Sequence, residues 1–304
     1  MPELPDVMVY VEALEKRIAG HRLSKARVKS PFVLRTFDPP IDACEGKLIT
    51  TIQRLGKRII LALEDDLFLV IHLMIAGRLR WTDADDAAPP KGAGKIELAS
   101  FSFDSGTLVL TEASPKKRAS LHVLRGRPAL NGADPGGLEV VGSSLANFAA
   151  RLRAENHTLK RSLTSPKLFS GIGNAYSDEI LHAAHLSPIK LTRSLTDNDI
   201  AALHAATQQT LTDWQQRLRV EFGLHQGRGR FPGPGEITAF RPDFAVHGKF
   251  GKPCPVCGST VRRIIYAENE CNYCPGCQTG GKVLADRSLS RLLKEDWRKE
   301  MEGE

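Results

Sequence analysis

Apolar residues recur with two different periods along this 304-residue chain. Close to the start they fall three and four positions apart, which is the spacing of one helix face, at Val7, Tyr10, Val11, Leu14 and Ile18. From Leu23 to Leu110 the pattern changes to short β-rich runs separated by turn residues, most clearly at 58–63, 67–73, 96–103 and 107–113. The pattern therefore predicts an N-terminal helix followed by a β-sandwich or barrel.

Helical periodicity replaces the strand pattern from about Asn131 onward. Four segments show it, namely 143–154, 159–164, 174–184 and 196–218. The following stretch is too rich in Gly and Pro for a regular element, and a loop of this length is usually functional or mobile. After the last cysteine, we expect an amphipathic helix through Leu289, Leu292, Leu293 and Trp297.

Composition narrows the class of protein. The chain is 41% hydrophobic and 25% charged, as expected for a globular protein with a sizeable core. No window is apolar for long enough to cross a bilayer, and the first twenty residues do not resemble a secretion signal, so we expect an intracellular protein. The 42 Lys and Arg residues exceed the 35 Asp and Glu residues, giving a net charge of +7, which favours a polyanionic partner.

Five of the six cysteines lie between positions 254 and 277, in two Cys-x-x-Cys pairs plus Cys271. A structural zinc ion takes four tetrahedral ligands, and each Cys-x-x-Cys turn supplies two of them. The sequence between the pairs can form two strands that bring the pairs together. We therefore predict one structural Zn²⁺ bound by Cys254, Cys257, Cys274 and Cys277.

Cys271 offers an alternative pair with Cys274, since it also precedes Cys274 by three positions. We prefer Cys274 with Cys277, because that pair encloses the Pro-Gly insert typical of such turns and leaves Cys271 as a strand residue. A zinc ion with four protein ligands has no open position for catalysis. We call the cysteine-containing segment 253–279 the zinc ribbon. It is therefore expected to hold a basic hairpin, with Arg262 and Arg263, against a partner.

The N-terminal sequence Met-Pro-Glu-Leu-Pro-Asp is unusual. If Met1 is removed, Pro2 presents a secondary amine beside the carboxyl group of Glu3. An α-amino group has a pKa near ~8, and the positive end of the following helix lowers it further. Such an amine is partly unprotonated at neutral pH and can form a Schiff base with an aldehydic carbon.

Together with the two cysteine pairs, the start "MPELPDV" resembles the formamidopyrimidine-DNA glycosylase and endonuclease VIII family of base-excision repair enzymes. Three further motifs match in the family's order, namely "GKRIILAL" with Lys57, "IHLMIAGRL" with His72 and "SGIGNAYSDEILHAAHLSP" with Asn174. The resemblance covers nearly the whole chain. It implies a multi-domain α+β protein in which the helical region is a helix-two-turn-helix domain.

The resemblance also implies roles for individual residues. Pro2 would be the nucleophile at the sugar C1′, and Glu3 would protonate the sugar oxygen. Lys57 would contact the phosphates beside the damaged nucleotide, with His72 and Asn174 as further phosphate ligands. Met74 and Ile75 would fill the gap left when the damaged base rotates out of the duplex.

Two segments depart from the family pattern. No aromatic residue stands in "TEASPKKRASLHVL", where the family places a void-filling arginine and phenylalanine, so Lys116, Lys117 or Arg118 would supply only charge toward the DNA backbone. In the ribbon, Asn269 stands where the family has a phosphate-binding arginine. Either a nearby arginine, Arg262 or Arg263, substitutes for it, or the phosphate is held less tightly.

We predict five parts, listed by residue range: a catalytic β-sandwich domain (1–130), a helix-two-turn-helix domain (131–222), a Gly- and Pro-rich loop (223–252), a zinc finger (253–279) and a C-terminal extension (280–304). The predicted protein is a monomeric, bacterial-type DNA glycosylase and AP lyase, acting in the cytoplasm or nucleoid on damaged double-stranded DNA through β,δ-elimination. The alternatives are the same scaffold specialised for oxidised pyrimidines or for bulky or crosslinked adducts, a DNA-binding protein without turnover, and an RNA-binding zinc-ribbon protein.

Overall fold

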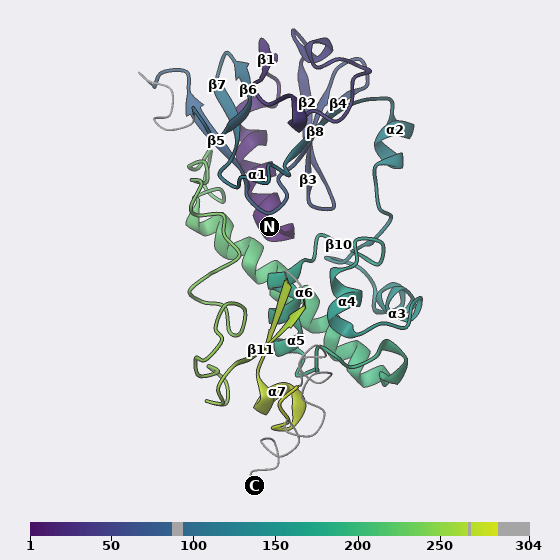
Figure 1. The fold of residues 1–304 in the computed structure, drawn as a ribbon. Helices are drawn as coiled ribbons and strands as arrows, with labels where there is room; N and C mark the ends of the chain where they lie inside the picture. The colour runs from purple at the N-terminus through teal and green to yellow at the C-terminus, as the bar shows by residue number, and fades with distance from the viewer. Residues whose placement is uncertain (87–93, 267–268, 285–304) are drawn as a thin grey trace. The chain divides into compact units, whose positions relative to one another are not determined.

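A computed structural model describes residues 1–86, 94–266 and 269–284 of the chain (Figure 1). These residues form two compact units. The first unit contains Met1–Val141, Ser165–Ile172 and Leu211–Ala239. The second contains Gly142–Thr164, Gly173–Thr210 and the chain from Phe240 onward.

The first unit is a β-sandwich with an N-terminal helix, α1 (Leu4–Ile18), as the sequence predicts. One antiparallel sheet has the order β1-β6-β7-β5, with bounds Lys25–Val28, Glu97–Phe103, Gly106–Glu112 and Gly77–Asp83. The other has the order β2-β3-β4-β8, with bounds Ile49–Leu55, Arg58–Leu63, Leu67–His72 and Ser120–Arg125. Shorter elements complete the unit: η1 (Pro31–Val33), η2 (Ile41–Cys44), α2 (Arg127–Gly132), and β9 (Leu138–Glu139) paired in parallel with β10 (Phe169–Ser170).

The main core lies between α1 and the two sheets, and Leu14, Leu69 and Phe101 are all fully buried within it. Strands β3 and β4 are buried on both faces, because Ile60 and Val70 pack on the opposite side in a second cluster with α2. Burial on both faces explains why these two strands have continuous apolar runs and not an alternating pattern.

The second unit holds α3 (Leu145–Arg153), α4 (Leu159–Thr164), α5 (Asn174–Ala183), the short helix η3 (Thr192–Ser194) and the first part of α6 (Asp197–Glu221). These helices confirm the four predicted helical segments, with end points that differ by up to three residues. A two-stranded hairpin follows, β11 (Arg262–Tyr266) with β12 (Asn269–Tyr273), and then the short helix α7 (Pro275–Thr279).

The predicted loop over 223–252 contains turns and bends but no helix or strand in the structure. The helix expected through Leu289 and Trp297 lies outside the described residues. Among the described residues, no helix has the length and apolar character needed to span a membrane.

Candidate active site and metal centre

The N-terminus is held in a buried position at the start of α1. Pro2 is buried and Glu3 is only 2% exposed. The backbone N–H of Glu3 donates to Asp6 Oδ2 at 2.9 Å, so Asp6 caps the first turn of α1. The next residue, Leu4, donates its N–H to Gly171 O at 3.0 Å. A side chain at position 171 would meet Leu4, and Gly171 has a φ of +81°, so glycine permits this close approach.

Charged groups surround the α-amino group of the chain, which belongs to Met1. Burial lowers the pKa of this amine, and Arg78 and Lys57 lower it further, while Glu3 and Asp6 oppose the shift. The pKa is lowered overall. An amine in this position is therefore deprotonated more readily than an ordinary α-amino group.

Lys57 lies in the two-residue turn between β2 and β3, and His72 is the last residue of β4, opposite Arg58. Burial lowers the pKa of His72 to about 4, and the positive charges of Arg58 and Lys57 add to this shift. His72 is therefore neutral at pH 7. A neutral imidazole can donate one N–H hydrogen bond to an anion, but it brings no charge of its own.

A tight turn after β4 exposes an apolar side chain. Met74 has a φ of +53°, in the left-handed region that is uncommon for a side-chain-bearing residue. The turn closes with a hydrogen bond of 2.8 Å from Gly77 N to Leu73 O, and Arg78 Nη1 donates to the carbonyl of Gly77 at 2.7 Å. Ile75 at the tip is 55% exposed. An exposed apolar residue on a fixed turn suits insertion between stacked bases.

The basic turn between β7 and β8 is organised by Glu112, which is buried. Its carboxylate accepts hydrogen bonds from Arg118 N at 3.1 Å and Ala119 N at 3.0 Å. The side chains of Lys116 and Arg118 are exposed, and Lys117 is half-buried with its ammonium donating to the carbonyl of Glu112. The exposed cations can meet phosphates, whereas this turn has no aromatic side chain to stack on a base.

In the second unit, Asn174 is the first residue of α5, and Gly173 is the N-cap. The ammonium group of Lys160 fixes this helix start, because it donates to Asn174 O at 2.6 Å, Ser177 Oγ at 2.8 Å and Asp178 Oδ1 at 2.5 Å. The backbone N–H groups in the first turn of a helix and its dipole form a favourable site for an anion.

The cysteines of the ribbon come together as a potential metal site. Cys257 Sγ lies 3.3 Å from Cys274 Sγ, and Cys254 Sγ lies 3.9 Å from Cys277 Sγ. Two sulfurs bound to one tetrahedral zinc ion are about 3.8 Å apart, given Zn–S bonds of about 2.3 Å. Each of these two sulfur pairs therefore has a separation that suits two ligands of one zinc ion, but the group of ligand atoms that all lie within 4.8 Å of one another includes Cys254, Cys274 and Cys277 and not Cys257. Cys271 is a buried strand residue opposite Ile264, which agrees with its exclusion from the predicted ligand set.

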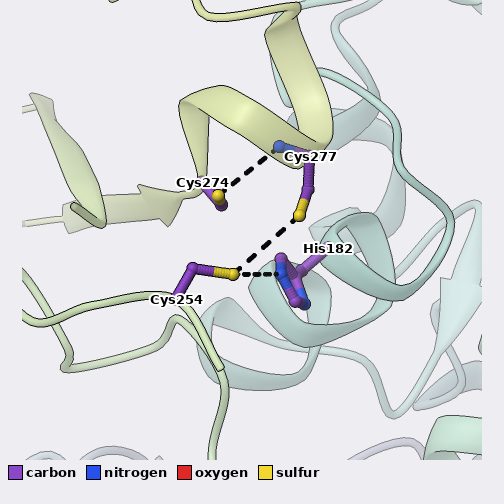
Figure 2. A group of neighbouring side chains, drawn as sticks. All are labelled: His182, Cys254, Cys274 and Cys277. Carbon is purple, nitrogen blue, oxygen red and sulfur yellow. Dashed lines mark hydrogen bonds between the residues drawn. The ribbon is translucent and has the colours of Figure 1, made fainter. Parts of the chain in front are cut away.

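Figure 2 shows His182, a residue of α5, beside three of these cysteines, Cys254, Cys274 and Cys277. His182 Nε2 lies 3.3 Å from Cys254 Sγ. Its ligand atom and those of Cys254, Cys274 and Cys277 all lie within 4.8 Å of one another. The sequence alone does not indicate this contact, because His182 lies 72 residues before Cys254 and has none of the spacing of a metal motif.

Two further side chains of α5 hold the ribbon and the loop before it. Asp178 Oδ2 accepts from His247 Nδ1 at 2.7 Å and from Asn272 N at 3.0 Å. Glu179 accepts from the backbone N–H groups of Ala245, Val246 and His247 at 2.7 to 2.9 Å. Burial alone would raise the pKa of Asp178, but Lys160 and His247 lower it overall. Asp178 therefore remains ionised as the centre of a buried network.

The hairpin presents its arginines on β11. Both Arg262 and Arg263 are exposed. The Arg263 guanidinium lies 4.3 Å from the centre of the Phe250 ring, with Nη1 3.5 Å from Glu270 Oε2. Asn269 begins β12 and pairs with Tyr266 across the hairpin. Arg263 thus has neighbouring groups that orient it, and Arg262 projects from the adjacent position of the same strand.

Comparisons with known proteins agree with this architecture. Residues 1–118 match the model of the formamidopyrimidine-DNA glycosylase N-terminal domain, and residues 138–216 match that of the formamidopyrimidine-DNA glycosylase H2TH domain. A formamidopyrimidine-DNA glycosylase of Desulforamulus reducens is 30% identical over 91% of this chain and 99% of the relative. The chain belongs to the formamidopyrimidine-DNA glycosylase family. The family resemblance, the fold class and the assignment as a DNA glycosylase are thus confirmed.

One further sequence relative and one solved structure also resemble this chain. An uncharacterized formamidopyrimidine-DNA glycosylase-like protein of Mycobacterium tuberculosis is 40% identical over 171 residues, covering 56% of this chain and 100% of that protein. A Lactococcus lactis FPG variant, solved in complex with a Fapy-dG containing DNA, superposes with a TM-score of 0.77 at 27% identity. That match covers 91% of this chain and 100% of the Lactococcus lactis chain.

Proposed function

We propose that this protein is a bifunctional DNA glycosylase and AP lyase whose nucleophile is the amine of Pro2 after removal of Met1. The proposal is supported by the burial of Pro2 and Glu3 at the start of α1, where the amine of the preceding Met1 has a pKa that is lowered by burial and by the charges of Arg78 and Lys57. A nucleophilic amine must be unprotonated, and a neighbouring acid must supply a proton to the substrate. Both groups occur at this N-terminus.

In the proposed reaction, the Pro2 nitrogen attacks the sugar C1′ and the bond from C1′ to the damaged base breaks. Glu3 gives a proton to the sugar ring oxygen, and the ring opens to leave an iminium ion between Pro2 and C1′. The iminium acidifies the C2′ proton. Loss of that proton expels the 3′ phosphate and then, in a second elimination, the 5′ phosphate. Water releases the sugar fragment and restores the amine.

The remaining predicted residues would hold the DNA. We assign Lys57, His72 and Asn174 to the phosphates of the damaged strand, and Met74 with Ile75 to the space that the flipped nucleotide leaves. The exposed cations Lys116, Arg118, Arg262 and Arg263 would contribute further backbone contacts, and Asn269 would offer an uncharged hydrogen bond.

Cys254, Cys257, Cys274 and Cys277 are proposed to bind one structural Zn²⁺. When bound, the ion would supply a cross-link that holds the hairpin and helix α7 in one geometry, and no step of the reaction requires it. The residues of this chain that perform chemistry lie at the N-terminus. The ribbon would position Arg262 and Arg263.

The proposed partner is damaged double-stranded DNA. We propose that a monomer binds it in the cytoplasm or nucleoid. Neighbouring structures from Lactococcus lactis were solved with DNA containing Fapy-dG and with DNA containing an oxidized pyrimidine, so both lesion classes are candidates. The uncharged Asn269 favours an alternative in which this scaffold accepts other lesions, such as bulky adducts, with a looser phosphate contact. A lesion panel distinguishes these substrates.

Borohydride trapping tests the function. Wild-type protein with a processed N-terminus, incubated with a duplex that contains one abasic site, is expected to form a covalent adduct after reduction. Pro2→Gly should lower the adduct yield at least about 100-fold, in line with loss of a covalent catalyst. Glu3→Gln should slow base release by about 100-fold or more, as expected for loss of a general acid. Absence of any wild-type adduct would mean a DNA-binding protein without turnover.

A further inference from the structure

Five side chains, not four, converge on the metal centre of the ribbon. Two sulfur pairs, Cys254 with Cys277 and Cys257 with Cys274, have separations that suit a zinc tetrahedron, and the proposed zinc ion takes these four cysteines as its ligands. His182 is a fifth group with one ring nitrogen at 3.3 Å from Cys254 Sγ and only 4% exposure. The two Cys-x-x-Cys pairs do not explain why a buried histidine lies beside Cys254.

We propose that His182 donates a hydrogen bond from Nε2–H to the zinc-bound thiolate of Cys254 and thereby stabilises the metal site. The inference rests on the proposed zinc ion. A thiolate bound to zinc has no proton, so it acts only as an acceptor, and the hydrogen between the two atoms must belong to the imidazole. The distance of 3.3 Å is suitable for an N–H···S hydrogen bond.

The electrostatics of the site favour such a donor. Four thiolates and one Zn²⁺ carry a net charge of about −2, and charge in a buried site is unfavourable unless hydrogen bonds offset it. Cys254 and Cys274 are both buried. Donors that contact metal ligands raise metal affinity, and their loss typically costs about 10- to 100-fold.

The same hydrogen bond attaches the ribbon to α5. Asp178 of this helix binds the hairpin at Asn272, and Gln278 of α7 donates to Leu186 O, just beyond the end of the helix, at 2.9 Å. His182 adds a direct contact from the helix to a metal ligand. Since α5 begins at Asn174, the helix that carries a proposed phosphate contact also stabilises the zinc ribbon. His182 is thus a positioning residue for the ribbon.

Two substitutions at one position separate hydrogen bonding from packing. His182→Phe keeps a ring but has no N–H donor, whereas His182→Gln keeps an N–H donor of similar reach but has no ring. Zinc release from the full-length protein to a chromophoric chelator is the readout. We expect release from the His182→Phe protein to be about 10-fold faster than from the wild type, and release from His182→Gln within about threefold of it. A packing role predicts the opposite order and would overturn the proposal.

His185→Asn is the matched control. His185 lies three positions beyond His182, is exposed and has a φ of +55°, a conformation that Asn tolerates. Its zinc release should equal that of the wild type. If His185→Asn accelerated release as much as His182→Phe, a general loosening of this helix end would explain both results, and the proposed hydrogen bond would be rejected.

Cobalt substitution tests whether His182 is instead a ligand. The intensity of the thiolate-to-cobalt absorption reports the number of sulfur ligands. Cys257→Ser should lower it by about one quarter, because one of four thiolates is lost, and His182→Phe should leave the ligand-field bands unchanged. A band shift in His182→Phe with no change in Cys257→Ser would show direct ligation by His182. If the wild-type protein contained no zinc, the metal site itself would be rejected. If zinc were bound but its release rates were equal in the wild type and His182→Phe, only the proposed hydrogen bond would be rejected.

Discussion

At the scale of single residues, the protonation states of a few groups decide what the proposed site can do. The α-amino group has a lowered pKa because it is buried beside Arg78 and Lys57. His72 has a pKa of about 4 for the same two reasons, burial and neighbouring positive charge. Burial and neighbouring positive charge therefore favour the uncharged form of both the amine proposed as nucleophile and the imidazole proposed as phosphate ligand.

Because His72 is buried in its neutral form, it makes the free energy of unfolding depend on pH, and the protein becomes less stable as the pH falls. The folded protein holds a neutral imidazole down to about pH 4, whereas the unfolded chain binds a proton below about pH 6.5. Unfolding therefore takes up a proton between these values, and stability from this group falls as pH decreases from 6.5 to 4. In urea unfolding at pH 7 and pH 4.5, His72→Gln should show a smaller pH effect than the wild type. A pH effect equal to that of the wild type would contradict the buried, neutral state.

The exposed His225 supplies the control for this measurement. His225→Gln should leave the difference in unfolding free energy between the two pH values as it is in the wild type. This comparison removes any general effect of losing one imidazole from the chain.

At the scale of elements, the turn from Leu73 to Gly77 is the clearest case of local structure that serves a proposed role. A Cβ on Gly77 would lie 2.3 Å from Leu73 O, so this tight turn requires glycine. The turn fixes Met74 with a positive φ and leaves Ile75 exposed. Exposure of the apolar side chain of Ile75 to water is unfavourable in free energy, and contact with bases would remove this exposure.

Ile75→Ser should therefore reduce excision from duplex DNA while leaving the fold intact. We expect about a 10-fold loss of single-turnover rate on a duplex, since burial of a partly exposed isoleucine between bases contributes on the order of 1–2 kcal/mol. The melting temperature should change little, because Ile75 is 55% exposed. Ile189, which is 41% exposed in the second unit, provides the control variant Ile189→Ser. Equal rates for the wild type and Ile75→Ser would reject the wedge.

Periodicity predicted the elements well, because each helix or strand depends on its own residues. The bounds of α4 and β3 match the predicted segments, and the buried strand β4 was evident from its apolar run. The contacts made by distant residues were not predictable. His182 lies in no metal-motif spacing, and no sequence pattern indicates that Arg78 acts on the N-terminal amine; these contacts follow only from the folded chain.

Other features needed the tertiary structure for a different reason. Strand β1 pairs with β6, about seventy positions later, and no local pattern fixes that choice. The residues 165–172 and 211–239 pack with the first unit although they follow helices of the second. Pairing and packing depend on the total burial of the chain, which a single segment does not encode.

At the scale of the whole molecule, the excess of basic residues predicts how DNA binding responds to salt. Each phosphate that the protein neutralises lowers the slope of log K against log salt by about 0.9. The double variant Arg262→Ala, Arg263→Ala should make this slope less steep by about 2 for a lesion duplex. Fluorescence anisotropy at several salt concentrations measures it. An unchanged slope would remove the ribbon from the proposed DNA contacts.

Lys25→Ala is a suitable control for the slope. Lys25 is exposed on β1, and its ammonium group lies 3.1 Å from the carboxylate of Glu45, so its charge is already balanced within the protein. The salt slope of Lys25→Ala should equal that of the wild type, even though the net charge changes by one.

The site of the covalent bond shows most directly whether the amine of Pro2 attacks the sugar. Protein reduced with borohydride on abasic DNA is digested, and mass spectrometry locates the attached sugar fragment. We expect attachment to an N-terminal peptide that begins at Pro2, with Met1 absent and Lys57 unmodified. Attachment to Lys57, the neighbouring amine that also influences the α-amino group, would contradict the assignment of the nucleophile.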